Sequence, residues 1–136
     1  MIVQDIMTPN PITLEVTETV QDAIDMLNDM DIRHIPVVDN GVLVGMISDR
    51  DLRDFSLPMM VRFNNPEEVA KRCKTGIAKL MYSDVVTVGS EADVSEVAEI
   101  MIDHKIGAIP VCDEVEGNLI GIVSYIDVLR AATELF

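Results

Sequence analysis

Two serine–aspartate pairs at the same spacing, Ser48 with Asp51 and Ser124 with Asp127, carry the clearest chemical pattern in the 136-residue chain. Each pair follows a short apolar run, GMIS or GIVS, which is typical of a strand that leads into a helix. One interpretation is structural, because a serine followed three residues later by an acid caps a helix. The other is functional, because free amides at a helix start attract an anion and a nearby carboxylate accepts hydrogen bonds from ribose hydroxyls. The spacing alone is compatible with both.

No arrangement typical of an enzyme accompanies these motifs. The two histidines, His34 and His104, have no cysteine or carboxylate at a metal-ligand spacing. The sequence contains neither a glycine-rich phosphate loop nor a G-x-S-x-G motif. The two cysteines, Cys73 and Cys112, lie far apart, as expected of reduced thiols in a cytoplasmic protein. We therefore expect no catalytic residues and no metal site, and the chain is predicted not to be an enzyme.

The charge balance restricts the class of partner. The formal net charge is −14 and the isoelectric point is near 4.2, so the surface should repel phosphate backbones and anionic membranes. With two Tyr, three Phe and no Trp, there is little material for stacking nucleobases. No apolar run is long enough to cross a membrane, and the N-terminus does not resemble a secretory signal. We expect a cytoplasmic protein without general nucleic-acid binding or membrane insertion.

The chain repeats itself. A shift of 74 residues places the IPV sequence of 35–37 on that of 109–111, and a shift of 76 places the first Ser-x-x-Asp motif on the second. The two-residue difference indicates an insertion near Val115 and Glu116. Identical residues recur at these two shifts over the whole motif region, which indicates two copies of one structural unit.

Each copy contains the same predicted elements in the same order. A short helical turn (3–7 or 77–81) precedes a short strand (12–14 or 86–88). An amphipathic helix follows, with apolar residues at the helical spacing. These are Val20, Ala23, Ile24 and Leu27 in the first copy, and Val94, Val97, Ala98 and Met101 in the second. Thr19 with Asp22, and Asp93 with Glu96, are the predicted helix starts. A two-stranded hairpin comes next, with Asn40-Gly41 as a favoured tight turn in the first copy, and a last helix begins at Ser48 or Ser124.

The element order predicts an α+β fold of two pseudo-symmetric β-α-β-β-α units packed sheet to sheet. A single unit of roughly 50 residues would bury too little surface to be stable alone. The expected division is a first unit over 1–56, a partly helical inter-repeat segment over 57–76 and a second unit over 77–136.

The inter-repeat segment has no counterpart elsewhere in the chain. Asn65 is a suitable helix cap and Pro66 a suitable first helical residue, and bases follow from Lys71 onward. Seven of the ten Lys and Arg residues fall within 50–79. These bases either complement the end of a helix or form a local basic patch for an anionic ligand or an acidic partner.

The paired units resemble CBS domains, and the whole chain resembles a tandem CBS pair, or Bateman module. The matching segments are MTPNPITL and LMYSDVVTV, RHIPVVD and GAIPVCD, and GMISDRDL and GIVSYIDV. The resemblance implies two units that pack through their sheets, with clefts between them that bind adenine nucleotides or related adenosyl compounds. It also implies dimerisation and a regulatory role.

The resemblance assigns ligand-binding roles to particular positions. They are Thr13, Arg33, His34, Ile35, Ser48, Arg50, Asp51, Thr87, Ala108, Ile109, Ser124 and Asp127. In this assignment Asp51 and Asp127 bind the ribose hydroxyls. The threonines and isoleucines lie beside the purine, although taken singly a strand threonine reflects β-propensity and an isoleucine is a core residue.

The two copies differ where the resemblance places phosphate contacts. Arg33, His34 and Arg50 of the first copy could balance a phosphate, or they could be ordinary surface charges. The second copy has Gly107, Ala108 and Tyr125 instead, which argues against phosphate binding by its own residues at these positions. A cleft between the copies could still take cations from either copy, and Lys105 is a candidate substitute.

The functional expectation is a regulatory module that binds AMP, ADP, ATP, NAD or S-adenosylmethionine-like ligands and transmits a conformational signal to a protein partner. An adenosyl effector is implied, no cofactor is required, and a homodimer is expected. The alternative is a ligand-free dimerisation or scaffold module that recognises a protein partner through its acidic surface.

Overall fold

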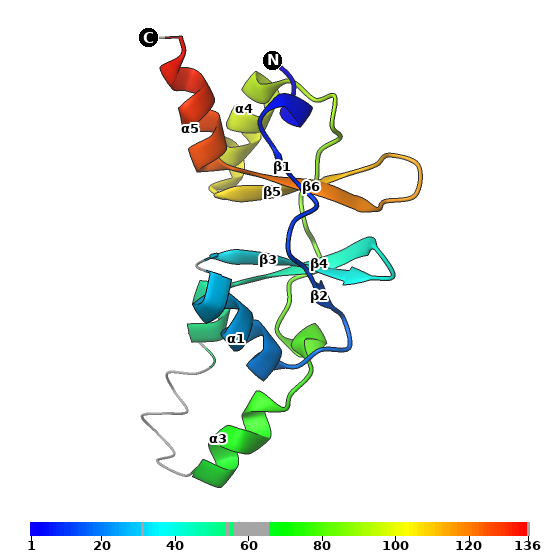
Figure 1. Cartoon of the computed structure of the whole chain (residues 1–136), viewed down its shortest axis with the longest axis vertical. Coiled ribbons are helices and arrows are strands. Elements are labelled where there is room, and N and C mark those ends of the chain that lie inside the picture. Colours follow the sequence, from blue (N-terminus) through cyan, green and yellow to red (C-terminus); the bar gives the residue numbers. More distant parts are fainter. Residues whose placement is uncertain (31, 54, 56–65, 136) are drawn as a thin grey trace. The chain divides into compact units, whose positions relative to one another are not determined.

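The computed structural model describes residues 1–30, 32–53, 55 and 66–135 (Figure 1). The chain forms two compact units, each built around a three-stranded sheet. The β3–β4 unit comprises Ile12–Asn40 and Val44–Val85, and the β5–β6 unit comprises Met1–Pro11, Gly41–Leu43 and Val86–Phe136. A mixed α/β architecture with two similar sheets agrees with the predicted fold class.

The β3–β4 unit has the strand order β2 (Leu14–Glu15), β3 (His34–Asp39), β4 (Val42–Ser48). β2 runs parallel to β3, and residues 49–53 continue β4 as a helix. The remaining elements are α1 (Val20–Met30), α3 (Pro66–Cys73) and the short 3-10 helix η2 (Ile77–Lys79). Alternation along β3 and the apolar stripe of α1 bury one core. Its buried residues are Leu14, Val20, Ala23, Ile35, Val37, Ile47, Leu52 and Ile77.

The β5–β6 unit repeats this plan. Its strand order is β1 (Thr8–Pro9), β6 (Leu119–Ser124), β5 (Ala108–Cys112), with all pairs antiparallel. The helices are η1 (Val3–Asp5), α4 (Val94–His104) and α5 (Tyr125–Thr133), which follows β6 directly. The buried core residues are Val3, Val97, Met101, Ile109, Val111 and Val123.

The compact units do not coincide with the sequence repeats, because the two repeats exchange their N-terminal segments. β1 of the first repeat pairs with β6 of the second, with Thr8 opposite Ile122. Tyr82 of the second repeat pairs with Met46 on β4, and each backbone N–H of that pair donates to the other's carbonyl. The exchange satisfies the outer edges of β4 and β6, which would otherwise present unpaired backbone groups. The divisions 1–56 and 77–136 therefore describe the sequence repeats, whereas each compact unit draws on both.

A glycine on β4 and another on β6 permit this exchange. A Cβ atom on Gly45 would lie 2.5 Å from Sδ of Met81 and 3.0 Å from the carbonyl oxygen of Tyr82. A Cβ atom on the equivalent Gly121 would likewise lie 2.5 Å from Sδ of Met7. The methionine of each exchanged segment thus packs directly against the glycine backbone, in space that a side chain at the glycine position would occupy.

Replacement of Gly45 by alanine should therefore loosen the exchanged segment. We expect Gly45→Ala to lower the free energy of unfolding by about 1–3 kcal/mol, because the carbonyl of Tyr82 cannot move without breaking its pairing with Met46. Urea unfolding measures the loss, and amide exchange at Tyr82 should accelerate. Gly76→Ala is the matched control, since Gly76 has a negative φ and no atom within 4 Å of the added carbon. Equal losses in the two variants would contradict this account.

Most local predictions are confirmed. Asn40 and Gly41 both have positive φ, 50° and 87°, as a two-residue hairpin turn requires. α1 and α4 begin as predicted, and the Thr19–Asp22 cap is formed. Asp93 caps α4 by position only, since its side chain accepts no capping hydrogen bond within the described chain.

Two other predictions have different outcomes. The strand expected at 86–88 is reduced to a single bridge between Val88 and Val111, and the strand expected at 12–14 lies at Leu14–Glu15. The inter-repeat helix is confirmed as α3, starting at Pro66 and ending with Lys71 and Arg72 in its last turn. The predicted cap Asn65 lies outside the described residues.

Candidate functional site

The first Ser-x-x-Asp motif closes a capping box where β4 meets the helix at 49–53; we call this the Ser48 corner. The amide and hydroxyl of Ser48 donate to Oδ2 of Asp51 at 3.1 and 2.8 Å. The amide of Asp51 donates back to Oγ of Ser48 at 3.1 Å. The amide of Asp49 donates to the carbonyl of Arg33 at 2.9 Å, which ties the corner to the start of β3.

The second motif forms the same box at the junction of β6 and α5, the Ser124 corner. The amide and hydroxyl of Ser124 donate to Oδ2 of Asp127 at 2.8 and 3.0 Å, and the amide of Asp127 donates to Oγ of Ser124 at 3.3 Å. Here the amide of Tyr125 donates to the carbonyl of Gly107 at 2.9 Å. The structural interpretation of both motifs is therefore confirmed.

Capping leaves half of each carboxylate available. Both capping hydrogen bonds that each carboxylate accepts go to Oδ2, and within the described part of the chain Oδ1 of Asp51 and of Asp127 accepts none. Both aspartates are half-buried, so each is fixed in orientation while one oxygen stays free. A fixed carboxylate oxygen of this kind accepts hydrogen bonds from hydroxyl groups without further ordering cost.

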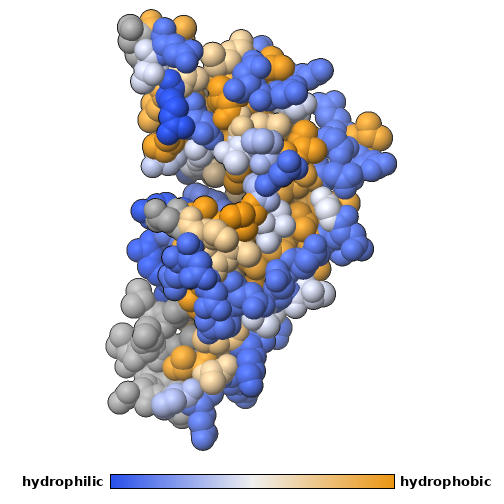
Figure 2. All heavy atoms as spheres, viewed as in Figure 1, coloured by the Kyte–Doolittle hydropathy of each residue, from blue (hydrophilic) through white to orange (hydrophobic). Residues whose placement is uncertain are grey.

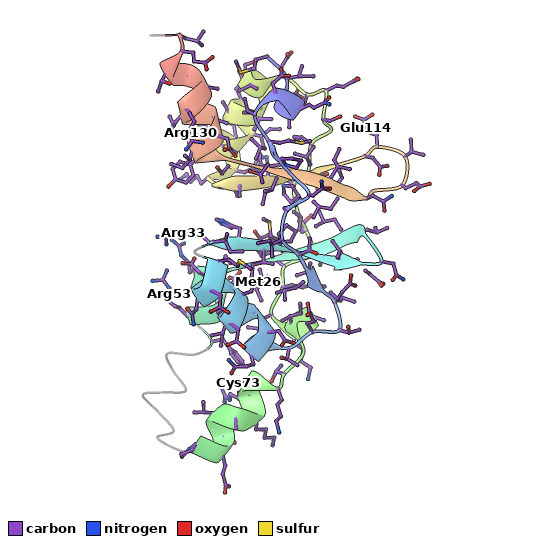
Figure 3. The ribbon with its side chains drawn as sticks, in the orientation of Figure 1. Met26, Arg33, Arg53, Cys73, Glu114 and Arg130 are labelled. Carbon is purple, nitrogen blue, oxygen red and sulfur yellow. The ribbon has the colours of Figure 1, made fainter. Side chains whose placement is uncertain are left out.

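Two arginine side chains reach Asp49 next to the Ser48 corner. Arg33 and Arg53 both reach Oδ2 of Asp49, at 3.3 and 3.4 Å, and Figure 3 shows the two side chains on the same side of the β3–β4 unit. Arg50, which follows Asp49 in sequence, is exposed. Because the Arg33 side chain is 74% exposed, its ion pair adds little stability, and its guanidinium can reach an anion. The predicted cations Arg33 and Arg50 thus lie at the predicted corner, together with Arg53.

His34 begins β3 next to this corner. Burial lowers the pKa of its imidazole below the ordinary value of 6.5, while the charges of Asp49 and Asp51 oppose that shift and Arg33 reinforces it. A histidine with a lowered pKa is neutral near pH 7, so His34 offers a hydrogen-bonding ring rather than a fixed positive charge.

This shift predicts a pH dependence of stability. Because the folded pKa lies below the unfolded pKa, the unfolded chain binds more protons in the window between the two values. The stability contributed by neutral His34 is complete above pH 6.5 and is lost as the pH falls toward the folded pKa. His34→Gln should flatten the fall in unfolding free energy on the acid side of pH 6.5. An unchanged slope in urea titrations at several pH values would contradict this assignment.

The Ser124 corner has different surroundings. Gly107 takes the place of Arg33, and a Cβ there would lie 3.4 Å from the ring of Tyr125. Tyr125 is half-exposed, and Ala108 is buried at the start of β5.

The remaining predicted residues are spread over the two units. The side chains of Ile35 and Ile109 are fully buried in the two cores, and their role beside a purine stays a prediction. Thr13 is half-buried just before β2. Thr87 lines a hollow of about 390 Å³ with Cys112 and the β5–β6 loop. Roles of the two threonines beside a purine stay predictions.

The sequence analysis did not predict that the exchanged segments place Tyr82 and Thr8 near the two corners. Tyr82 pairs with Met46, two residues before Ser48. Burial raises the pKa of Tyr82, and the charge of Asp51 adds to this, so the phenol lies within electrostatic range of the corner. The equivalent residue, Thr8, holds the same place two residues before Ser124. The 74-residue shift pairs Thr8 with Tyr82, and that correspondence was the available signal.

The described residues show neither a metal-binding cluster nor a membrane-spanning helix. They hold no cluster of three or more His, Cys, Asp or Glu side chains that could bind a metal ion. No helix among them is long and apolar enough to span a membrane. Hydrophilic residues cover much of the face drawn in Figure 2.

The fold and the site place the chain in the class of duplicated α/β proteins, with a capped carboxylate that keeps one free oxygen at each strand-to-helix corner. Comparison with known families gives the particular family: the CBS domain model matches residues 3–57 and 77–134. The chain belongs to the CBS domain family, as a tandem pair. A CBS domain-containing protein of Dictyostelium discoideum is 33% identical over 130 residues, which cover 95% of this chain and 89% of that protein. The chain spans less than half of some other relatives, for example 44% of a Methanocaldococcus jannaschii protein.

Solved CBS pairs have the same fold. CBSX2, solved in complex with AMP and known from Arabidopsis thaliana, has a TM-score of 0.82 at 28% identity, and the match covers 98% of this chain and 97% of that one. The CBS domain pair of protein MJ0100, solved with 5′-methylthioadenosine and S-adenosyl-L-methionine, has a TM-score of 0.78 at 27% identity, covering 100% and 98%. Both structural neighbours therefore bind adenosyl compounds.

Proposed function

We propose that the chain is a regulatory module that binds adenosine-containing small molecules through its Ser48 and Ser124 corners. The observation that carries the proposal is the unused Oδ1 of Asp51 and of Asp127, held by capping at two equivalent places. The ligands of the structural neighbours, AMP, methylthioadenosine and S-adenosylmethionine, share an adenosine with vicinal ribose hydroxyls. Those hydroxyls are the donors that a fixed carboxylate oxygen accepts.

The Ser48 corner is suited to a phosphorylated ligand. Arg33 and Arg53 place two guanidinium groups at Asp49 beside it, Arg50 lies within the motif in sequence, and guanidinium is the side chain best matched to phosphate oxygens. Displacing Asp49 from Arg33 and Arg53 would cost little, because both arginines are exposed.

Regulation requires a partner that responds to the bound state. A ligand shifts a conformational equilibrium only by its difference in affinity for the two states. Exposed apolar side chains on α5, Ile126 and Leu129, support contact with a second protein or a second copy. We propose that such a contact transmits the signal.

Light scattering with and without AMP tests whether this contact forms a homodimer. A monomeric mass in both conditions would contradict the homodimer.

Isothermal titration with AMP, ATP, methylthioadenosine, S-adenosylmethionine and, as a base control, GMP tests the binding proposal. We expect saturable binding of at least one adenosine compound and a weaker response to GMP. If none of these compounds binds at millimolar concentration, the binding proposal fails, and the ligand-free scaffold becomes the better account.

A further inference from the structure

Each exchanged segment holds a methionine sulfur against a glycine, at equivalent places in the two units. A Cβ atom on Gly45 would lie 2.5 Å from Sδ and 3.0 Å from Cγ of Met81. One on Gly121 would lie 2.5 Å from Sδ and 3.2 Å from Cγ of Met7. Each thioether therefore fills the space that a side chain on β4 or β6 would occupy, and any group added to the sulfur has to compete for that space.

The same two methionines lie at the borders of the apolar cores. Met81 packs against the core of the β3–β4 unit, and Met7 packs against the core of the β5–β6 unit. Both side chains are half-buried, whereas Met46 is only 1% exposed and Met30 is 53% exposed. Met7 and Met81 thus contribute to packing and still lie within reach of a small oxidant from solvent.

Hydrogen peroxide converts a thioether of this kind to a sulfoxide. One oxygen atom passes from the peroxide to the sulfur as the O–O bond breaks and an S–O bond forms. The sulfur loses two electrons, and the other peroxide oxygen leaves as water. The product is larger at the sulfur and strongly polar, so it needs a hydrogen-bond donor or water around the new oxygen. Methionine sulfoxide reductases reverse the step.

The backbone beside Met81 does not accommodate such an oxygen. The amides of Met46 and Tyr82 donate to each other's carbonyls at 2.9 and 3.0 Å, so neither can donate to a sulfoxide without breaking the bridge. The carbonyl of Tyr82 lies 3.0 Å from the Cβ position of Gly45, and two oxygens close together repel each other. Room and water for the added oxygen therefore come from movement of the segment away from β4.

We propose that Met7 and Met81 are oxidation sites, and that their conversion to methionine sulfoxide releases the exchanged segments from β6 and β4. The duplication of the chain places one such site in each unit. Tyr82 pairs with Met46, two residues before Ser48, so oxidation would loosen the strand end that carries the Ser48 corner. The proposal is independent of the proposed function, because the release is measured on the ligand-free protein.

Mild oxidation of the full chain with hydrogen peroxide, followed by peptide mass spectrometry and hydrogen–deuterium exchange, tests the proposal. Once Met81 is a sulfoxide, amide exchange at Tyr82 should accelerate by about tenfold or more. Oxidation of Met7 should have the same effect on the amide of Asn10, which donates to the carbonyl of Ile120 at 3.2 Å. Treatment with methionine sulfoxide reductase should restore both exchange rates.

Leucine variants separate these methionines from the other side chains that peroxide attacks, including the two cysteines. Leucine keeps the apolar volume and has no sulfur to oxidise, so exchange in the double variant Met7→Leu, Met81→Leu should stay slow after treatment. Met30→Leu makes the same change at an exposed side chain and is the control, which should respond to peroxide as the wild type does. Urea unfolding before treatment establishes that each variant is folded.

Three outcomes would overturn the proposal. The first is formation of the Met81 sulfoxide with no change in exchange at Tyr82. The second is an equal acceleration in the double leucine variant and in the wild type. The third is a Met81 that stays reduced under conditions that oxidise the buried Met46. If the double variant does not fold, oxidation and repair of the wild type decide between acceptance and rejection. Failure of this proposal leaves the proposed function standing, and the reverse also holds.

Discussion

The double variant Asp51→Asn, Asp127→Asn should lose the stabilisation that an adenosyl ligand gives to the wild-type protein. A ligand at 100 times its dissociation constant raises the free energy of unfolding by about 2.7 kcal/mol. Asparagine retains one oxygen to accept the capping hydrogen bonds of Ser48 and Ser124, but it replaces the free carboxylate oxygen with an amide group. Urea unfolding with and without AMP, or whichever adenosyl compound binds most tightly, measures the difference.

The chain supplies a matched control for this experiment. Asp22 caps α1 in the same way, with Oδ2 accepting the amide and hydroxyl of Thr19 at 3.0 Å each. Asp22→Asn therefore perturbs an equivalent capping box that no ligand is proposed to touch. It should keep the full ligand-induced stabilisation. If the double variant also keeps it, the carboxylates of the two corners do not bind the ligand.

The second large effect concerns the core under the Ser124 corner. Ile109 is fully buried on β5, so Ile109→Ala should lower the free energy of unfolding by about 2–5 kcal/mol through lost burial and a residual cavity. Ile102→Ala, on α4 of the same unit, makes the same change at a side chain that is 73% exposed. The control should stay within about 0.5 kcal/mol of the wild type.

Denaturant unfolding of both variants measures these losses. A loss below about 1 kcal/mol in Ile109→Ala would contradict the assignment of Ile109 to the core. It would instead favour the role beside the purine that the family resemblance implies, and ligand titrations on the same variant would then be informative.

Local features were predictable because they depend on neighbours in sequence. The repeat, the hairpin turn at Asn40-Gly41 and the two Ser-x-x-Asp caps follow from backbone preferences and short side-chain reach. The buried stripe of α1 follows from its 3.6-residue period.

Features that depend on distant contacts were not predictable. The sequence repeat is the same whether the N-terminal segment of each copy packs on its own copy or on the other. The exchange of β1 and of the Tyr82 segment therefore could not be inferred. For the same reason Tyr82 could not be placed near Asp51, nor Met81 against Gly45. A capping motif also does not show which carboxylate oxygen stays free, because that depends on the side-chain rotamer.

The central claim is that Asp51 and Asp127 bind the ribose hydroxyls of the ligand. Its most direct test is a thermodynamic cycle that combines a change in the ligand with a change in the protein. AMP and 2′,3′-dideoxy-AMP are titrated into the wild type and into the Asp51→Asn, Asp127→Asn variant. We predict that removal of the ribose hydroxyls costs the wild type about 1.5–3 kcal/mol of binding free energy, as expected for hydrogen bonds to a charged group. The same removal should cost the variant little, which gives a coupling energy of similar size. Equal costs in the two proteins would show that the hydroxyls do not contact Asp51 or Asp127, and would contradict the account.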